Sequence, residues 1–324
     1  MVTRQPDVDP AVAATADDIE AMRIRGAATI ADAAAEALST QAKRSDATAP
    51  DVFERQLRAA AKTLYETRPT AVSLPNALRY VLRGMDGESV SALRDATIAR
   101  AEEFQRELAR AQTTLGTVGA NRLRDGDVVM THCHSTDALA CLEAALEDGK
   151  EVEAIVKETR PRKQGHITAQ QLREWGVPVT LIVDNAARRY LDEADHVLVG
   201  ADSIAADGSV INKIGTSGLA VNARERGVPV MVAAQTIKLH PDTMTGHTVE
   251  IEMRAESEVV SDEERRTITG DADDGLVVAN PAFDVTPPRY VDAIVTERGQ
   301  FPPESIVTLM RELFGEMTGE PWEP

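Results

Sequence analysis

The sequence predicts an α/β protein with a helical N-terminal domain over residues 1–122 and a doubly wound, mostly parallel sheet domain over residues 123–324. Two observations predict this division. Apolar residues recur at three- and four-residue spacing in the first part, whereas short continuous apolar runs alternate with helical segments from residue 125 onward. Strands that are apolar throughout are buried on both faces, which is typical of parallel sheets covered by helices.

Four segments of the first domain have the helical pattern. They cover residues 16–26, 28–44, 51–69 and 91–123. Pro69 marks a helix boundary, because the residue before a proline is disfavoured in a helix. No segment of this domain has a convincing strand pattern.

Seven apolar runs predict the strands of the second domain. They cover residues 127–132, 152–158, 178–183, 196–200, 229–234, 275–280 and 293–297. Helices are expected between most of them, at residues 137–149, 168–176 and 215–227, and glycine often ends them. The acidic segment 245–275 is the longest irregular one, and we expect it to be solvated surface or an oligomer contact outside the site. Parallel sheets of this kind bind ligands at the carboxyl ends of their strands.

The composition excludes several classes of protein. The chain has 53 acidic and 35 basic residues, a net charge of −18, and only seven lysines. This excess of acidic residues favours adaptation to concentrated salt, because at 1 M salt the repulsion between charges is screened beyond about 3 Å. The alternative is that the acidic residues only keep the protein soluble. It lacks the basic surface of a nucleic-acid-binding protein. The absence of a long apolar run or a signal-peptide pattern indicates a soluble, cytoplasmic protein. The two cysteines do not suggest a disulfide, and Cys141 is expected in the core.

A thiol follows the first predicted strand, in the segment MTHCHSTDAL. The next helix begins near Asp137, and a helix N-terminus binds phosphate and stabilises a nearby thiolate. Cys133 is therefore a candidate catalytic base, with a buried inert cysteine as the alternative. A metal site is disfavoured, because His132 and His134 point away from Cys133 on an alternating strand and their spacing matches no structural zinc pattern.

Polar residues at other strand ends and helix starts suit an anionic ligand. Asp202 follows the fourth predicted strand, where a carboxylate faces a ligand or caps a turn. Asn212 and Lys213 precede a glycine-flexed helix start, which suits phosphate without the P-loop spacing. Lys238 follows the fifth strand as a site cation or a surface lysine. Arg25 and Arg68 are further candidate cations, with a surface arginine as the alternative. The remaining candidates lie at helix starts, and they are Gly26, Ala27, Ala28, Ser135, Thr136 and Asp137. Together these loops suit a ligand with two phosphates.

Six motifs resemble those of the archaeal ribose 1,5-bisphosphate isomerase family, and the similarity runs from about residue 20 to the C-terminal FGEMTGEPWEP. They are RIRGAATIA, ETRPTAVSLPNALRY, MTHCHS, KETRPRKQG, GADSIAADGSVINKIGT and NPAFDVTPPRYVDAIVTERG. The wider superfamily includes methylthioribose-1-phosphate isomerase and the regulatory subunits of translation initiation factor 2B. NKIGT and NPAFDVTP are shared that widely, whereas ETRPTAVSLPNALRY with THCHS points to the bisphosphate isomerase.

The resemblance implies a Rossmann-like second domain in which Cys133 and Asp202 are the catalytic pair. The substrate contacts that it implies are Arg25, Gly26, Ala27, Ala28, Arg68, Ser135, Thr136, Asp137, Asn212, Lys213 and Lys238. We expect backbone contacts at Thr136 and Asp137, with the Asp137 side chain capping the helix. The resemblance also implies a homohexamer built as a trimer of dimers, makes AMP a plausible activator, and implies neither a metal nor a cofactor.

A thiol and a carboxyl group fit the aldose–ketose isomerisation that the resemblance implies. A Cys133 thiolate would remove the C2 proton and return a proton to C1 of a phospho-enolate, while a neutral Asp202 opens the sugar ring. The helix terminus and cations should lower the thiol pKa from about 8.5, and burial should raise the carboxyl pKa from about 3.9. The alternatives are a methylthioribose-1-phosphate isomerase, which needs an apolar pocket, and a non-catalytic initiation factor 2B subunit.

Overall fold

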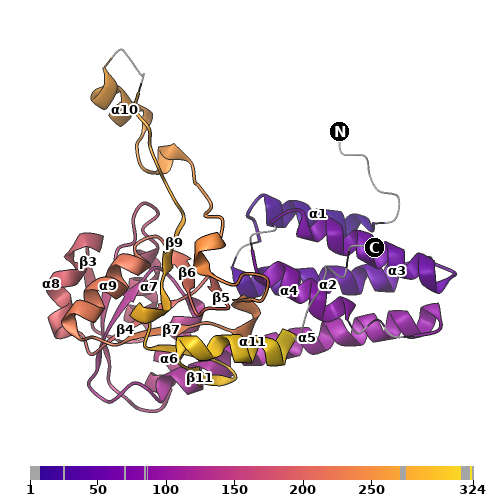
Figure 1. The fold of residues 1–324 in the computed structure, drawn as a ribbon, viewed down its shortest axis with the longest axis horizontal. Coiled ribbons are helices and arrows are strands. Elements are labelled where there is room, and N and C mark those ends of the chain that lie inside the picture. Colours follow the sequence, from indigo (N-terminus) through magenta and orange to yellow (C-terminus); the bar gives the residue numbers. More distant parts are fainter. Residues whose placement is uncertain are drawn as a thin grey trace. The chain divides into compact units, whose positions relative to one another are not determined.

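The computed structural model describes residues 8–24, 26–68, 71–83, 85, 87–270, 275–314 and 322. The chain divides into two compact units (Figure 1). The first unit comprises Met1–Ala111, Ile237–Leu239 and Phe314–Pro324, and the second comprises Gln112–Thr236 and His240–Leu313. The domain boundary between residues 122 and 123 stays a prediction.

The first unit is helical. Its helices are α1 (Pro10–Glu20), α2 (Ala27–Arg44), α3 (Pro50–Tyr65), α4 (Ser73–Leu82) and the N-terminal part of α5 (Val90–Ala120). Helix α2 packs against α1, α3 and α4 around a core that includes Leu38, Phe53 and Leu57. The helix predicted over residues 16–26 is wrong in its second half, because α1 ends at Glu20 and the chain turns at Met22, where φ is 58°.

Helix α4 was not expected from the sequence. It lies in the motif ETRPTAVSLPNALRY, where a proline disrupts the apolar pattern. Pro75 falls in the first turn of α4, where a missing N–H breaks no helical hydrogen bond. Pro69, which the sequence marks as a helix boundary, lies outside the described residues.

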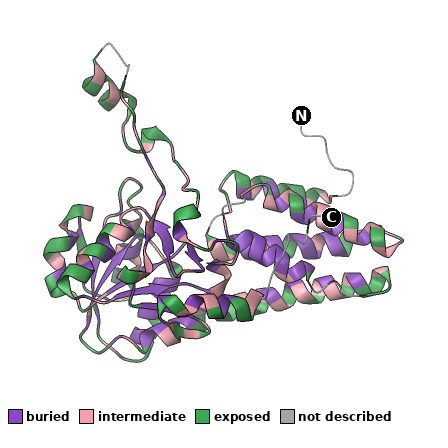
Figure 2. Ribbon diagram, viewed as in Figure 1, coloured by how far each residue is buried: buried purple, intermediate pink, exposed green. Residues whose placement is uncertain are grey.

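The second unit contains the predicted doubly wound sheet. Its strands are β1 (Val128–His132), β2 (Glu153–Lys157), β3 (Val179–Ile182), β4 (His196–Gly200), β7 (Val230–Ala233), β10 (Ala293–Thr296) and β11 (Gly299–Phe301). The strand order is β11-β10-β7-β4-β1-β2-β3, and every pair is parallel except β10 with β11. The inner strands are almost wholly buried, whereas the edge strands β3 and β11 are partly exposed (Figure 2). The predicted fold class is confirmed.

The direction of winding reverses between β1 and β4. The chain proceeds from β1 through β2 to β3 on one side, and from β4 through β7 to β10 on the other. Helices α6 (Thr136–Glu147), α7 (Gln164–Glu174), α8 (Ala187–Tyr190), α9 (Thr216–Arg226) and α11 (Ile306–Phe314) connect or follow these strands. Sheets of this class bind ligands at such a reversal, beyond the carboxyl ends of the strands. Cys133 follows β1 and Asp202 follows β4, so both lie at this point.

Short strands that the sequence did not predict form a second, antiparallel sheet. Strand β6 (Val210–Lys213) pairs with β5 (Ser203–Ala205) and with β9 (Phe283–Thr286). Strand β8 (Leu239–His240) has two residues. Strands of two to four residues are too short for a periodicity that the sequence could reveal. Between β5 and β6 the chain makes a tight turn, in which the Gly208 N–H donates to Ala205 O at 2.9 Å and Gly208 has φ 80°.

The acidic segment after β8 extends away from the sheet of the second unit and carries α10 (Asp262–Thr269) (Figure 1). The strand predicted over residues 275–280 is wrong: this stretch has no regular strand, and Val277 is 85% exposed. No helix in the described part of the chain is both long enough and apolar enough to cross a membrane.

Candidate active site

The backbone at Cys133 adopts a left-handed conformation with φ 71°, which is uncommon for a residue other than glycine. The Cys133 N–H donates to Thr159 Oγ1 at 2.9 Å, and Thr168 Oγ1 donates to Cys133 O at 2.8 Å. Two threonines from other segments therefore satisfy both backbone groups of this residue and hold its conformation. Strained residues held in this way are concentrated at functional sites.

The two histidines beside Cys133 serve the structure around it. His132 Nε2 lies 2.8 Å from Ile214 O, and Thr159 Oγ1 lies 3.2 Å from His132 Nδ1. Burial, with the nearby Lys157 charge, lowers the pKa of His132 to about 4, so its ring is neutral at pH 7. His134 Nδ1 lies 3.0 Å from Thr168 Oγ1. In the described part of the chain, no three His, Cys, Asp or Glu residues are grouped so that they could hold a metal ion.

The prediction that the Cys133 thiol has a lowered pKa is wrong. Burial, together with the Asp202 charge, raises the pKa of Cys133 to about 11. The His134 backbone N–H and the charges of Lys213 and Arg254 oppose this shift, but desolvation is the larger effect. The thiol is therefore protonated at neutral pH.

Cys133, Asp202 and Lys213 form one electrostatic cluster. Burial lowers the pKa of Lys213, and the charges of Asp202 and Cys133 act in the opposite direction. The Lys213 ammonium donates to Ala282 O at 3.1 Å and lies 4.6 Å from the Phe283 ring centroid. The expectation that Asp202 is buried is wrong, because this residue is exposed, at the start of β5.

The start of α6 lies directly beside the end of β4. Ser135 caps α6, and its Oγ accepts from the Ala138 N–H at 3.2 Å. A Cβ added at Gly200 would lie 2.1 Å from Ser135 Oγ, so only glycine allows this approach. The expectation that Asp137 caps the helix is wrong. Its fully buried carboxylate accepts from the Gln235 backbone N–H at 3.2 Å and from Gln235 Nε2 at 2.8 Å.

The loop after Lys213 is ordered by hydrogen bonds within the second unit. Asn212 Nδ2 donates to Thr216 Oγ1 at 3.0 Å. The carboxylate of Asp284 accepts from the Gly215 N–H at 2.7 Å and from the Ser217 N–H at 3.1 Å, so it occupies the start of α9. A phosphate at this loop would therefore be bound by the side chains of Asn212 and Lys213 instead of by the helix terminus.

Sequence reasoning missed three further residues of this site, Lys157, Asp284 and Arg254. Lys157, which is buried, donates to Gly215 O at 3.2 Å, and the Asp284 charge opposes the fall of its pKa on burial. Asp284 lies in the quoted motif NPAFDVTP, which offered a signal. Arg254 comes from the acidic segment expected to lie outside the site, and its charge lowers the pKa of both Cys133 and Lys213.

The other predicted ligand-binding residues belong to the first unit. Gly26 is the N-cap of α2 with φ 93°, and no side chain caps this helix, which therefore starts with Ala27 and Ala28 as expected. Lys238 is buried, in the turn Thr236–Lys238. Asn76 Nδ2 donates to Ile237 O at 2.9 Å and to Leu239 O at 2.8 Å, which holds the backbone on both sides of Lys238. Arg68 is partly buried, and Arg25 lies outside the described residues.

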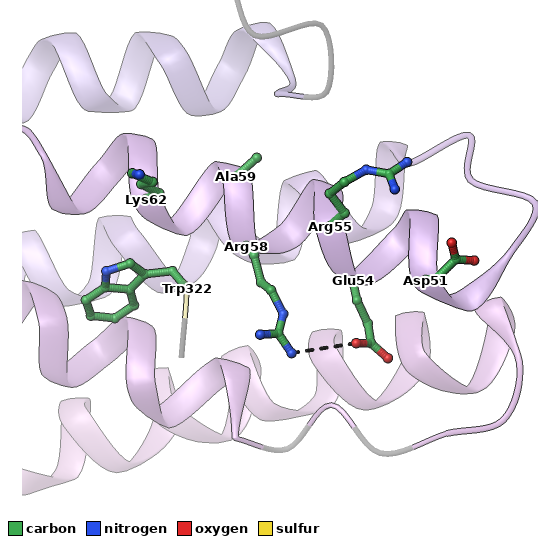
Figure 3. A pocket seen from close by; sticks show the side chains of 7 residues that line it. All are labelled: Asp51, Glu54, Arg55, Arg58, Ala59, Lys62 and Trp322. Atoms are coloured by element: carbon green, nitrogen blue, oxygen red, sulfur yellow. Dashed lines mark ion pairs between the residues drawn. The ribbon is translucent and has the colours of Figure 1, made fainter. Parts of the chain in front are cut away.

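A pocket in the first unit is separate from these residues (Figure 3). It is lined by Asp51, Glu54, Arg55, Arg58, Ala59, Lys62 and Trp322. Arg58 and Glu54 form an ion pair at 3.7 Å one helical turn apart on α3. None of the residues that the sequence singled out lines this pocket, so it is not the candidate active site.

The chain is an α/β protein with a helical unit and a doubly wound sheet. Its polar residues at the reversal of the strand order are typical of a ligand-binding site. The chain belongs to the initiation factor 2 subunit family, whose model matches residues 23–303. It is 82% identical to a ribose 1,5-bisphosphate isomerase of Haloterrigena turkmenica, over 100% of both chains. It is 71% identical to a ribose 1,5-bisphosphate isomerase of Haloferax volcanii, over 97% of this chain and 96% of that one. A solved structure of translation initiation factor eIF-2B from Pyrococcus horikoshii OT3 is 30% identical with a TM-score of 0.76, and the match covers 93% of this chain and 100% of that one.

Proposed function

We propose that this chain is an isomerase that converts ribose 1,5-bisphosphate into ribulose 1,5-bisphosphate. The observation that carries the proposal is full-length identity of 82% to a relative of that name, in a chain that places Cys133 and Asp202 at the strand reversal. The product is the substrate of the carbon-fixing carboxylase, so the reaction would feed sugars from AMP and nucleoside salvage into carboxylation.

The reaction needs a thiolate and a neutral carboxyl group, whereas the raised pKa of Cys133 keeps its thiol protonated at neutral pH. A sugar that covers Asp202 would remove water from its carboxylate, and desolvation favours the neutral form. Transfer of the Cys133 proton to Asp202 then produces both required states without exchange of protons with solvent. Thiol and carboxyl groups that interact in this way titrate as a pair.

The chemical steps follow from that pair. Asp202 gives its proton to the ring oxygen as the bond from this oxygen to C1 breaks. The Cys133 thiolate removes the C2 proton, which leaves a phospho-enol with a double bond between C1 and C2. Cys133 then returns a proton to C1 while the C2 hydroxyl loses its proton to Asp202, and the ketone forms. Each group ends in the state in which it began the reaction.

The two phosphates require cations in a chain of net charge −18. Lys213, whose charge interacts with Cys133, and the preceding residue Asn212 belong to the second unit and would bind one of them by charge-assisted hydrogen bonds. The backbone at Ser135, Thr136 and Asp137 would contribute N–H groups, because the Asp137 carboxylate is already bound by Gln235. We also propose contacts from Arg25, Gly26, Ala27, Ala28, Arg68 and Lys238.

The deciding experiment incubates the purified chain with ribose 1,5-bisphosphate in molar potassium chloride and detects ribulose 1,5-bisphosphate. Methylthioribose 1-phosphate serves as the competing substrate. Turnover of the bisphosphate alone supports the proposal, whereas preferential turnover of the thioether sugar would assign the chain to that isomerase. Binding of initiation factor 2 at native salt, without either activity, would indicate a regulatory subunit.

We further propose that the enzyme acts in the cytoplasm as a homohexamer, a trimer of dimers, and that AMP activates it. The salvage role supports the last point, because accumulation of AMP would then increase the flux through the pathway that consumes it. Light scattering combined with size exclusion in molar potassium chloride measures the assembly, and turnover with and without AMP measures the activation.

A further inference from the structure

Arg254 occupies a fixed position in the segment that leads from the sheet of the second unit to α10 (Figure 1). Its N–H donates to Asn280 O at 2.9 Å, and the Ala282 N–H donates to Glu252 O at 2.8 Å. These bonds make residues 252–254 and 280–282 a short antiparallel ladder, in which Met253 pairs with Pro281. The acidic segment is therefore ordered where it leaves the sheet.

The same ladder is joined to the candidate site. Residue Ala282, which donates to Glu252, accepts a hydrogen bond from the Lys213 ammonium at 3.1 Å. Beyond Arg254, Asn280 Nδ2 donates to Ala255 O at 2.9 Å. Glu258 forms an ion pair with Arg162 of the loop after β2. Bonds on both sides of Arg254 therefore hold its backbone next to the part of the site that contains Lys213.

The guanidinium of Arg254 has unused hydrogen-bonding capacity. Its side chain is only 14% exposed, and its Nε is buried with no hydrogen-bond partner. Its ion pair with Glu252 spans 3.5 Å, longer than a charge-assisted hydrogen bond. A buried donor without an acceptor is costly, so native proteins rarely keep one without a reason. The charge of this guanidinium acts on both Cys133 and Lys213, so it lies near the site.

We infer that Arg254 binds one of the two phosphates of the substrate and thereby selects a sugar bisphosphate over a sugar monophosphate. This inference rests on the proposed function. A guanidinium presents a planar fork of N–H donors that matches two phosphate oxygens, and its Nε would gain the acceptor that it lacks. The segment predicted to be solvated surface would then supply a specificity-determining residue.

Calorimetric titration separates this role from a general effect on folding. Ribulose 1,5-bisphosphate, ribulose 1-phosphate and ribulose 5-phosphate are titrated into the wild type, Arg254→Gln, Arg254→Lys and Arg266→Gln at one potassium chloride concentration. Arg266 is an exposed residue of α10, so its variant carries the same charge change in the same segment. Melting temperatures show whether each variant is folded.

Arg254→Gln is expected to weaken binding of the bisphosphate about tenfold to a hundredfold, the usual effect of losing hydrogen bonds to a charged group. One monophosphate should show the same loss, and the other, which lacks the phosphate that Arg254 binds, should show none. Arg254→Lys should recover part of the affinity, and Arg266→Gln should match the wild type. If Arg254→Gln does not fold, Arg254→Lys must still weaken bisphosphate binding selectively.

Two results would overturn the inference. The first is equal bisphosphate affinity in the Arg254 variants and the Arg266 control. The second is an equal loss for both monophosphates, which would mean that Arg254 only shapes the pocket. Failure of the wild type to bind or convert any bisphosphate would instead count against the proposed function. The two failures are therefore distinguishable.

Discussion

The Oγ1 atom of Thr159 accepts the backbone N–H of Cys133 at 2.9 Å, and this bond helps to fix the left-handed backbone from which the thiol projects. Thr159 itself has φ 64°, and its N–H donates to Asp184 at 2.9 Å. The position of the thiol thus depends on a turn after β2 that lies 26 residues further along the chain.

Thr159→Val should therefore lower kcat about tenfold while KM changes little, because the thiol is misplaced and the phosphate-binding residues are not. The variant should also lose about 1–3 kcal/mol of unfolding free energy, since the Cys133 N–H is left without an acceptor. Steady-state kinetics and urea unfolding measure both quantities. The control is Thr180→Val, at an exposed position of β3. Equal kcat values in the two variants would show that Thr159 does not position the thiol.

The raised pKa of Cys133 predicts slow alkylation at neutral pH. With a pKa of about 11, only about one thiol in 10⁴ is ionised at pH 7, so iodoacetamide should react far more slowly than with a free cysteine. The rate should rise steadily between pH 8 and pH 11. Mass spectrometry of the labelled peptide separates Cys133 from Cys141, whose pKa burial raises to about 12. A rate that reaches its plateau by pH 8 would contradict a protonated thiol in the free chain.

His132 should make the protein sensitive to acid. Its pKa is lowered to about 4 in the folded chain from 6.5, so the unfolded chain binds the proton more tightly. The neutral His132 ring therefore contributes fully to the unfolding free energy above pH 6.5, and this contribution is lost as the pH falls toward 4. Between pH 7 and pH 5 this group should cost about 2 kcal/mol of unfolding free energy. His132→Gln should remove that part of the pH dependence in urea unfolding, whereas His166→Gln, at an exposed position, should leave it unchanged.

The contact between Gly200 and Ser135 can be tested with a pair of glycine substitutions. Gly200→Ala should reduce the unfolding free energy by about 1–3 kcal/mol, because the added methyl would overlap Ser135 Oγ and displace the start of α6. Gly218→Ala in α9 is the control, because nothing lies within 4 Å of an added Cβ there and alanine favours a helix. Thermal melts should show a lower Tm for the first variant only. A Tm for Gly200→Ala as high as that of the control would mean that α6 shifts without cost.

Much of this fold follows from patterns within single segments. Strand β4 and helix α2 agree with their predicted ranges to within a residue, because continuous apolar runs and helical spacing are local features. The false strand at residues 275–280 shows the limit of that reasoning. Its apolar residues form no regular strand, Val277 is exposed, and only Asn280 at its end pairs with the segment 252–254.

Some residues of the candidate site could likewise be predicted from local patterns, and others could not. The strand-end rule led to Cys133 and Asp202, because both follow strands on either side of the reversal. Arg254 could not be found by that rule, since it reaches the site from an insertion through pairing with residues far along the chain. The direction of the Cys133 pKa shift was also missed, because the balance between burial and nearby charges depends on packing that a sequence does not reveal.

Turnover of ribose 1,5-bisphosphate by Cys133→Ser and Asp202→Asn, compared with the wild type in molar potassium chloride, tests the central claim most directly. Properly placed proton transfer contributes roughly 10²–10⁴ in rate, so each variant should lose at least about a hundredfold in kcat while its melting temperature stays near that of the wild type. Turnover near the wild-type rate in either folded variant would remove that residue from the mechanism and contradict the proposed pair.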